Sequence, residues 1–319
     1  MENEKITLPI SYFRVRTCIL SSYLLLLLAI SKLALYMLFH KTIVKFSLCA
    51  FALVVTSCKM VQPHSASDKF TPEKNEILPP VTIPCFAGAY YRKAVSSFDV
   101  WTGITGTVVT GKPTVDEARL DEKTKQPLDN FSVYMGGSAG GQYEVDAGLT
   151  WAFTQNAEGK FSEGRNAWRP FWRTKVWNNA PLSEAYTWYP GDTVRMEVRM
   201  TGPKKLRLVI ADAGVHPTKS FSVDFDADGF LSDVKRQFKR VNAIDQFHNE
   251  GKPVKPTDAK VLNAQWLGTK LFRGKKELPM NIHRFTDMRC SDASHIVVTP
   301  IDEMTGAEKI DIFGRPKAD

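Results

Sequence analysis

The sequence predicts an all-β fold, a two-sheet β-sandwich or jelly roll, preceded by a hydrophobic leader and a polar tether. Several short segments place apolar residues at every second position, which is typical of half-buried strands. Turn-forming Pro, Gly, Asn and Asp residues separate these segments. Beyond residue 80, roughly 240 residues remain without an internal repeat, a size typical of one sandwich or barrel domain.

The leader ends in a largely apolar run at residues 46–55. Basic residues precede this run and small polar residues follow it: His40, Lys41 and Lys45, then Thr56, Ser57 and Cys58. Because about 20 apolar residues are needed to span a bilayer, the run is too short to be a stable anchor. The layout predicts a signal peptide.

The residues before Cys58 form the triplet Val55-Thr56-Ser57. This triplet resembles the lipobox of bacterial lipoproteins, in which signal peptidase cuts before the cysteine. The resemblance implies that Cys58 becomes the lipidated N-terminus and that the membrane is a partner through this lipid. It also implies an extracytoplasmic place in the bacterial cell envelope. The alternative is a signal peptide that is cut elsewhere, with Cys58 an ordinary thiol.

A second apolar stretch lies upstream, at residues 18–39, and is interrupted by Lys32. A start at Met37 would give a signal peptide of ordinary length, and a membrane helix over residues 18–39 is the alternative. We therefore expect a leader at residues 1–57, a lipidated tether at 58–80 and a β-sandwich domain at 81–319. The expected tether is polar, contains proline and lacks periodicity.

The charges of the folded part are scattered and nearly balanced. The chain has 42 Lys and Arg and 34 Asp and Glu, and the leader holds six of the basic and two of the acidic residues. A nucleic-acid-binding protein normally clusters basic residues on one face, so we expect no nucleic-acid partner. Cys85 and Cys290 are the thiols of the domain, and outside the cytoplasm they could pair or stay as two separate buried thiols.

The clearest strand signal is a hairpin. Apolar residues stand at positions 194, 196, 198 and 200 with charged residues between them, and a turn leads to a second alternating segment at 206–212. Further strands are expected within residues 98–111, 131–137, 143–153, 220–225, 294–301 and 308–314. Segments 233–247 and 258–272 fit either a helix or a strand. We interpret both as strands, because isolated helices have little to pack against in a sandwich.

Five of the seven tryptophans fall within residues 151–188, interleaved with Arg and Asn. A sugar ring has an apolar C–H face and a hydroxyl edge, so flat aromatic rings beside polar side chains suit it. We expect an oligo- or polysaccharide to bind a surface formed by Trp168, Arg169, Trp172, Arg173, Trp177 and Trp188. The alternative is that most of these rings fill the core.

Glu144 and Asp146 are two residues apart, so on a strand both carboxylates face the same side. This spacing resembles the E-x-D core of laminarinase- and lichenase-type glycoside hydrolases. The resemblance implies a concanavalin-A-like jelly roll and makes these two residues candidate catalytic groups. Gly148 and Leu149 stand where that family has its second catalytic Glu, which argues against its mechanism. The alternative is a pair of solvated carboxylates or a partner for an arginine.

Asp224, Asp226 and Asp228 alternate before Gly229, like the first half of a calcium-binding loop, so calcium is a candidate ligand. Lys235 occupies the position of the loop's final Glu, and an exposed turn is the alternative. The histidines lack the spacing of a zinc site. We interpret the glycine-rich residues 136–141 as a flexible hairpin loop.

These patterns predict a membrane-anchored, extracytoplasmic lipoprotein whose β-sandwich binds carbohydrate. A carbohydrate-active enzyme, either hydrolase or lyase, is the second interpretation. A structural envelope protein without a sugar site is the third.

Overall fold

The structure is a computed structural model that describes residues 70–319 except 124, 141–142, 153–166, 215 and 316–319. The leader and Cys58 lie outside the described residues, so the signal-peptide and lipidation predictions stay predictions. Within the described ranges, no helix has the length and apolar character needed to cross a membrane.

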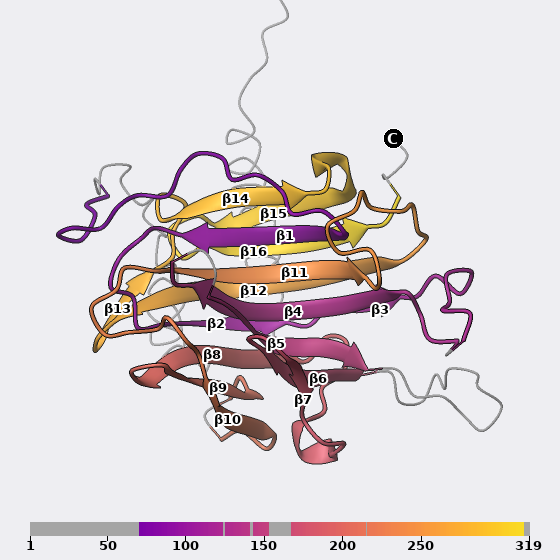
Figure 1. Cartoon of the computed structure of the whole chain (residues 1–319), viewed down its shortest axis with the longest axis horizontal. Coiled ribbons are helices and arrows are strands. Elements are labelled where there is room, and N and C mark those ends of the chain that lie inside the picture. The colour runs from indigo at the N-terminus through magenta and orange to yellow at the C-terminus, as the bar shows by residue number, and fades with distance from the viewer. Residues whose placement is uncertain (1–69, 124, 141–142, 153–166, 215, 316–319) are drawn as a thin grey trace, which may run out of the picture. The chain divides into compact units, whose positions relative to one another are not determined.

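Two antiparallel sheets stack face to face, which confirms the predicted all-β sandwich (Figure 1). The first sheet has seven strands, in the order β14 (Phe285–Cys290), β1 (Ala89–Ser96), β11 (Gln237–Gln246), β4 (Asp129–Ser138), β5 (Glu144–Ala152), β6 (Ala167–Arg173) and β7 (Trp177–Asn179). The second sheet has nine strands. Its main path is β10 (Ser220–Asp226), β9 (Lys205–Asp212), β8 (Thr193–Gly202), β2 (Gly103–Val109), β12 (Lys260–Arg273), β16 (Ala307–Phe313) and β15 (Ile296–Asp302), while β3 (Lys112–Thr114) and β13 (Lys276–Pro279) also pair with β12. The described part also contains two short 3-10 helices, η2 (Glu184–Tyr186) and η3 (Ala293–His295).

The core lies between the two sheets, whose strands run in nearly the same direction in Figure 1. The predicted hairpin is confirmed as β8 and β9. Its alternating apolar side chains are fully buried: Val194, Met196, Val198, Leu206, Leu208 and Ile210. Each such side chain stabilises the fold by about 1.5–3 kcal/mol relative to its exposed state.

Both ambiguous segments are strands, as expected. Strand β11 buries Phe238 and Ile244 toward the core and Val241 and Ala243 on its other face. A strand that is covered on both faces loses the simple alternation of apolar and polar residues, which explains its ambiguous pattern. Strand β12 contains two register shifts, each next to a residue with positive φ, so its pattern changes face along its length.

The glycine-rich segment at residues 136–141 was expected to be a loop, and this prediction is wrong for its first half. Gly136, Gly137 and Ser138 belong to β4 and pair with β5. A Cβ atom at position 136 would overlap the backbone oxygen of Val145. The glycine therefore serves close strand packing rather than flexibility.

The described residues form a compact unit that includes Phe70, whereas the sandwich domain was expected from residue 81. Ion pairs hold this N-terminal segment against the domain. Glu73 pairs with Arg273 at 3.3 Å and with Lys276 at 2.6 Å, and Glu76 pairs with Arg284 at 2.9 Å. The polar composition of this segment suggested a tether, although its acidic residues have specific partners.

Cys85 and Cys290 form a disulfide with a Cα–Cα distance of 5.7 Å. This bond selects the first of the two alternatives left open by the sequence. It attaches the segment before β1 to the end of β14, which is hydrogen-bonded to β1.

Candidate functional site

A pocket of about 350 Å3 opens on the face of the first sheet that points away from the main core. A second, small apolar cluster lies on this face and supplies part of the pocket floor. The floor residues from this cluster are Ala89, Tyr91, Val241, Ala243 and Tyr134. The pocket therefore has an apolar base, on which polar side chains are placed by strand register.

One row of residues crosses the sheet from β11 to β7, and all of them except Gly136 line the pocket. The register places Lys239 opposite Gly136, Gly136 opposite Asp146, Asp146 opposite Arg173, and Arg173 opposite Trp177. Since Gly136 has no side chain, the Lys239 ammonium reaches Asp146 across β4, with 2.7 Å between Nζ and Oδ1.

Lys239 also forms an ion pair with Glu144, which in turn lies 3.8 Å from the Lys93 ammonium. Burial disfavours the charge of Lys239, but the Asp146 and Glu144 carboxylates outweigh it and raise the pKa of Lys239. Burial likewise opposes ionisation of Glu144, yet the charges of Lys239 and Lys93 lower its pKa. Burial, together with the charge of Lys239, lowers the pKa of Lys93 to about 8. Lys239 and Glu144 are therefore charged at neutral pH.

Asp245 lies at the other end of the pocket, opposite Ala89 in the ladder of β1 and β11. The Ser132 hydroxyl donates a hydrogen bond of 2.7 Å to Asp245 Oδ2. No basic side chain of the described residues lies within ion-pair distance of this carboxyl. Burial, reinforced by the negative charge of Asp146, raises the pKa of Asp245 to about 6.

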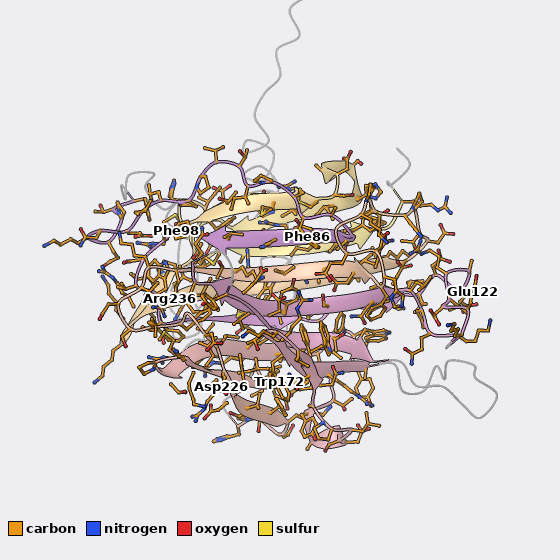
Figure 2. The ribbon with its side chains drawn as sticks, viewed as in Figure 1. Phe86, Phe98, Glu122, Trp172, Asp226 and Arg236 are labelled. Atoms are coloured by element: carbon orange, nitrogen blue, oxygen red, sulfur yellow. A yellow bond between two sulfur atoms is a disulfide. The ribbon has the colours of Figure 1, made fainter. Side chains whose placement is uncertain are left out.

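Three exposed aromatic rings form the rim of the pocket. Phe86 is 53% exposed, Phe247 51% and Trp177 40%. Figure 2 shows Phe86 beside the start of β1. The ring of Trp177 stacks on Phe171, with 4.3 Å between ring centroids and 4° between ring planes.

An ion pair joins the two sides of this rim. Arg173 Nη2 lies 3.7 Å from Glu250 Oε1, so the end of β6 is linked to the loop that follows β11. Because both side chains are substantially exposed, the pair is a weak contact that a ligand can displace.

The structure divides the predicted sugar-binding surface between two faces of the first sheet. Strand alternation turns Trp168 and Trp172 toward the core, whereas Arg169, Phe171 and Arg173 face the other way. Figure 2 shows Trp172 in the lower part of the fold, where it stacks on Phe221 of β10.

Trp168 and Trp188 are 1% and 0% exposed, so the prediction that they stack on a ligand is wrong. Their indole nitrogens donate hydrogen bonds to Gly111 O and to Asp212 Oδ1, at 3.1 Å and 2.8 Å. Trp172 was also expected to stack on a sugar. This prediction is wrong, because its side chain lies on the core face of β6 and packs against the core. Among the six expected residues, Trp177 and Arg173 line the pocket.

Glu144 and Asp146 lie on the same face of β5, as their spacing predicts, and both line the pocket. Both carboxylates pair with Lys239, and Asp146 also lies 3.8 Å from Arg173, an arginine partner of the kind considered from the sequence. Their catalytic role stays a prediction.

The aspartates expected to bind calcium do not converge on one point. Asp224 pairs with Arg207 at 2.6 Å, Asp226 with Lys205 at 2.6 Å, and Asp228 with Lys175 at 3.4 Å. Three carboxylates that are neutralised by three separate cations do not form a calcium loop. Throughout the described ranges, no group of three or more His, Cys, Asp or Glu side chains is arranged to hold a metal ion.

Most of the residues that line the pocket were not predicted from the sequence. Lys93, Lys239, Asp245, Phe86 and Phe247 come from β1, β11 and the segments next to them, far from the tryptophan-rich region. No local motif marks them, because the long-range pairing of β11 with β1 and with β4 brings them together.

No protein-family model matches this sequence, and no curated protein matches it significantly. Among solved structures, the chain is similar to scytalido-glutamic peptidase with a peptide-based transition-state analogue: 10% identity, TM-score 0.45, over 70% of this chain and 98% of that one. It is also similar to SCP-B, a member of the Eqolisin family of peptidases, in complex with the tripeptide Ala-Ile-His: 10% identity, TM-score 0.44, over 70% of this chain and 97% of that one. A second scytalido-glutamic peptidase structure, with a transition-state analogue inhibitor, gives 9% identity and a TM-score of 0.46 over 70% and 98%. Similarity at this level assigns neither an activity nor a substrate to the chain.

Proposed function

We propose that the pocket on the first sheet binds an oligosaccharide. The observation that carries the proposal is the combination of exposed aromatic rings at the rim, Phe86, Phe247 and Trp177, with a charged and hydrogen-bonding interior. Aromatic rings contact the C–H faces of sugars, while fixed carboxylates and ammonium groups bind their hydroxyls.

The dimensions of the pocket support a small saccharide. Ligand pockets commonly measure about 300–1,000 Å3, and this one has about 350 Å3. It suits a few sugar units, while the rest of a longer chain would extend past the exposed rim.

Retention on polysaccharides tests the proposal. Residues 59–319 are passed over a panel of immobilised polysaccharides, as wild type and as Trp177→Ala and Phe247→Ala variants. We expect each variant to weaken retention about tenfold or more, because stacking aromatics carry a large share of binding energy at such sites. Leu182→Ala is the matched control, since Leu182 is 71% exposed and does not line the pocket. Unchanged retention of both aromatic variants would refute the site.

A carbohydrate-active enzyme is the second candidate, favoured by four carboxyl groups in one pocket: Glu144, Asp146, Asp245 and Glu250. The environments of Glu144 and Asp245 push the pKa values of these two groups apart, since that of Glu144 is lowered and that of Asp245 is raised to about 6. Such separation is typical of an acid and base pair. In the same incubations, oligosaccharide products that appear by mass spectrometry and vanish in Glu144→Gln would favour the enzyme. Retention without products would favour a binding module.

We further propose that lipid on Cys58 anchors the protein outside the cytoplasm, on the support of the lipobox-like triplet before this residue. Two or more acyl chains give firm membrane attachment, at about 0.8 kcal/mol for each buried methylene. Cells that express the full chain should incorporate labelled fatty acid into it, and Cys58→Ser should abolish the label. Label that persists in the variant would disprove this attachment site.

A further inference from the structure

We propose that the pocket selects sugars that carry a protonated amine, and that Asp245 receives this amine. The inference rests on the proposed oligosaccharide site and adds the chemical class of its ligand.

The carboxylates of the pocket differ in whether they have a basic partner. Glu144 and Asp146 share Lys239, and Glu250 pairs with Arg173. Asp245 differs from these three, because its only direct polar partner in the described part of the chain is the hydroxyl of Ser132. A half-buried carboxylate without a counter-charge gains from a cationic ligand, since a hydrogen bond between charged groups is about twice as strong as a neutral one.

Asp245 lies beside two of the aromatic residues that form the rim. Phe247 follows Asp245 by two residues, and Phe86 precedes Ala89, the residue opposite Asp245, by three. Both rings line the pocket and are about half exposed. Aromatic faces attract ammonium groups, so an amine held by Asp245 would also meet favourable ring surface.

The charged groups around Asp245 leave its end of the pocket without a free cation among the described residues. The groups that act on Asp245 are the Ser132 hydroxyl from β4, Asp146 from β5, Arg173 from β6 and Glu250 from the following loop, and His248 of that loop also lines the pocket. Arg173 is already paired with Glu250 and lies 3.8 Å from Asp146. The lysines Lys93 and Lys239 lie toward the opposite end of strands β1 and β11. The Asp245 end of the pocket is therefore the end suited to a cation.

Isothermal titration with two saccharides of equal length tests the inference. Glucosamine oligomers carry amines, whereas N-acetylglucosamine oligomers have the same ring without the charge. At pH 6.5 we expect the amine form to bind about tenfold more tightly to residues 59–319. Asp245→Asn should remove this preference, while Asp226→Asn, a change at an exposed carboxylate outside the pocket, should keep it.

A pH series on the wild type gives a second readout that needs no variant. Acidification protonates the amine further, so a preference that falls below pH 6 comes from a group of the protein and not from the ligand, as expected for Asp245. Equal affinity for both oligomers would overturn the amine inference and leave the oligosaccharide site intact. A preference that survives in a folded Asp245→Asn protein, or at pH 5, would overturn the role of Asp245. Failure of every saccharide to bind would refute both proposals.

Discussion

Asp245 is held in the pocket at a cost to the fold. Its raised pKa means that the ionised carboxylate is less stable in the folded protein than in the unfolded chain. Natural binding sites often keep such unfavourable groups, because function rather than stability requires them. The same carboxylate that would attract a cationic ligand is therefore expected to weaken the empty protein.

Asp245→Asn should increase the free energy of unfolding at pH 7.5 by about 1–3 kcal/mol, since a pKa shift of one unit corresponds to about 1.4 kcal/mol. The folded pKa of about 6 lies above the usual value of 3.8. The stability from this group is thus fully present below pH 4 and is lost as the pH rises through 6. Urea unfolding at several pH values measures the gain.

The gain should shrink toward zero well below pH 4, where Asp245 is protonated in both the folded and the unfolded state. Asp226→Asn, which changes an exposed carboxylate paired with Lys205, serves as the control and should give no comparable gain. A variant that is destabilised at pH 7.5 would contradict the assignment of Asp245 as an energetically unfavourable group.

Strand β6 shows how an element separates residues that are neighbours in sequence. In Ala167–Arg173 the order Trp, Arg, Pro, Phe, Trp, Arg suggests one mixed surface, yet the period of two sends Trp168 and Trp172 inward and Arg169 and Arg173 outward. Once this segment is recognised as a strand, the division follows from the sequence. The strand itself was missed, because its outward face carries Phe171 and blurs the alternation.

A strand is easier to predict from the sequence when one of its faces is exposed to solvent. Strands β8 and β9 have one face in the core and one in solvent, so their alternation is plain in the sequence. Strands β1 and β11 are covered on both faces, and β1 was not predicted. The pocket is built on these two strands, so it was the part of the molecule least accessible from sequence. Glu144 and Asp146 were found because their spacing is local.

At the scale of the whole molecule, a buried ion cluster joins the two sheets. Glu308 of β16 pairs with Arg92 of β1 at 2.9 Å and with Arg240 of β11 at 3.0 Å. All three side chains are buried. Arg240 also donates a hydrogen bond to Thr269 of β12, at 3.0 Å. Such clusters fix the relative position of layers, because each charge is costly without its partner.

Glu308→Gln should lower the free energy of unfolding by about 3–5 kcal/mol, because it leaves Arg240 buried without its carboxylate partner and leaves Arg92 with Asp287 alone, at 3.0 Å. The matched control is Glu277→Gln, which removes an exposed pair with Lys270 at 2.8 Å and should cost about 1 kcal/mol or less. Thermal and denaturant unfolding of both variants make the comparison. Equal effects of the two changes would show that the buried cluster does not bind the layers together.

The Cys85–Cys290 disulfide has a mechanical consequence. Every residue that lines the pocket, from Phe86 to Glu250, lies inside the covalent loop that this bond closes. Tension applied between Phe70 and the end of β16 would pass through the sulfur atoms and would not stretch the strands that carry the pocket. Such a load would extend the N-terminal segment and peel away β15 and β16, while the pocket stays at its resting length.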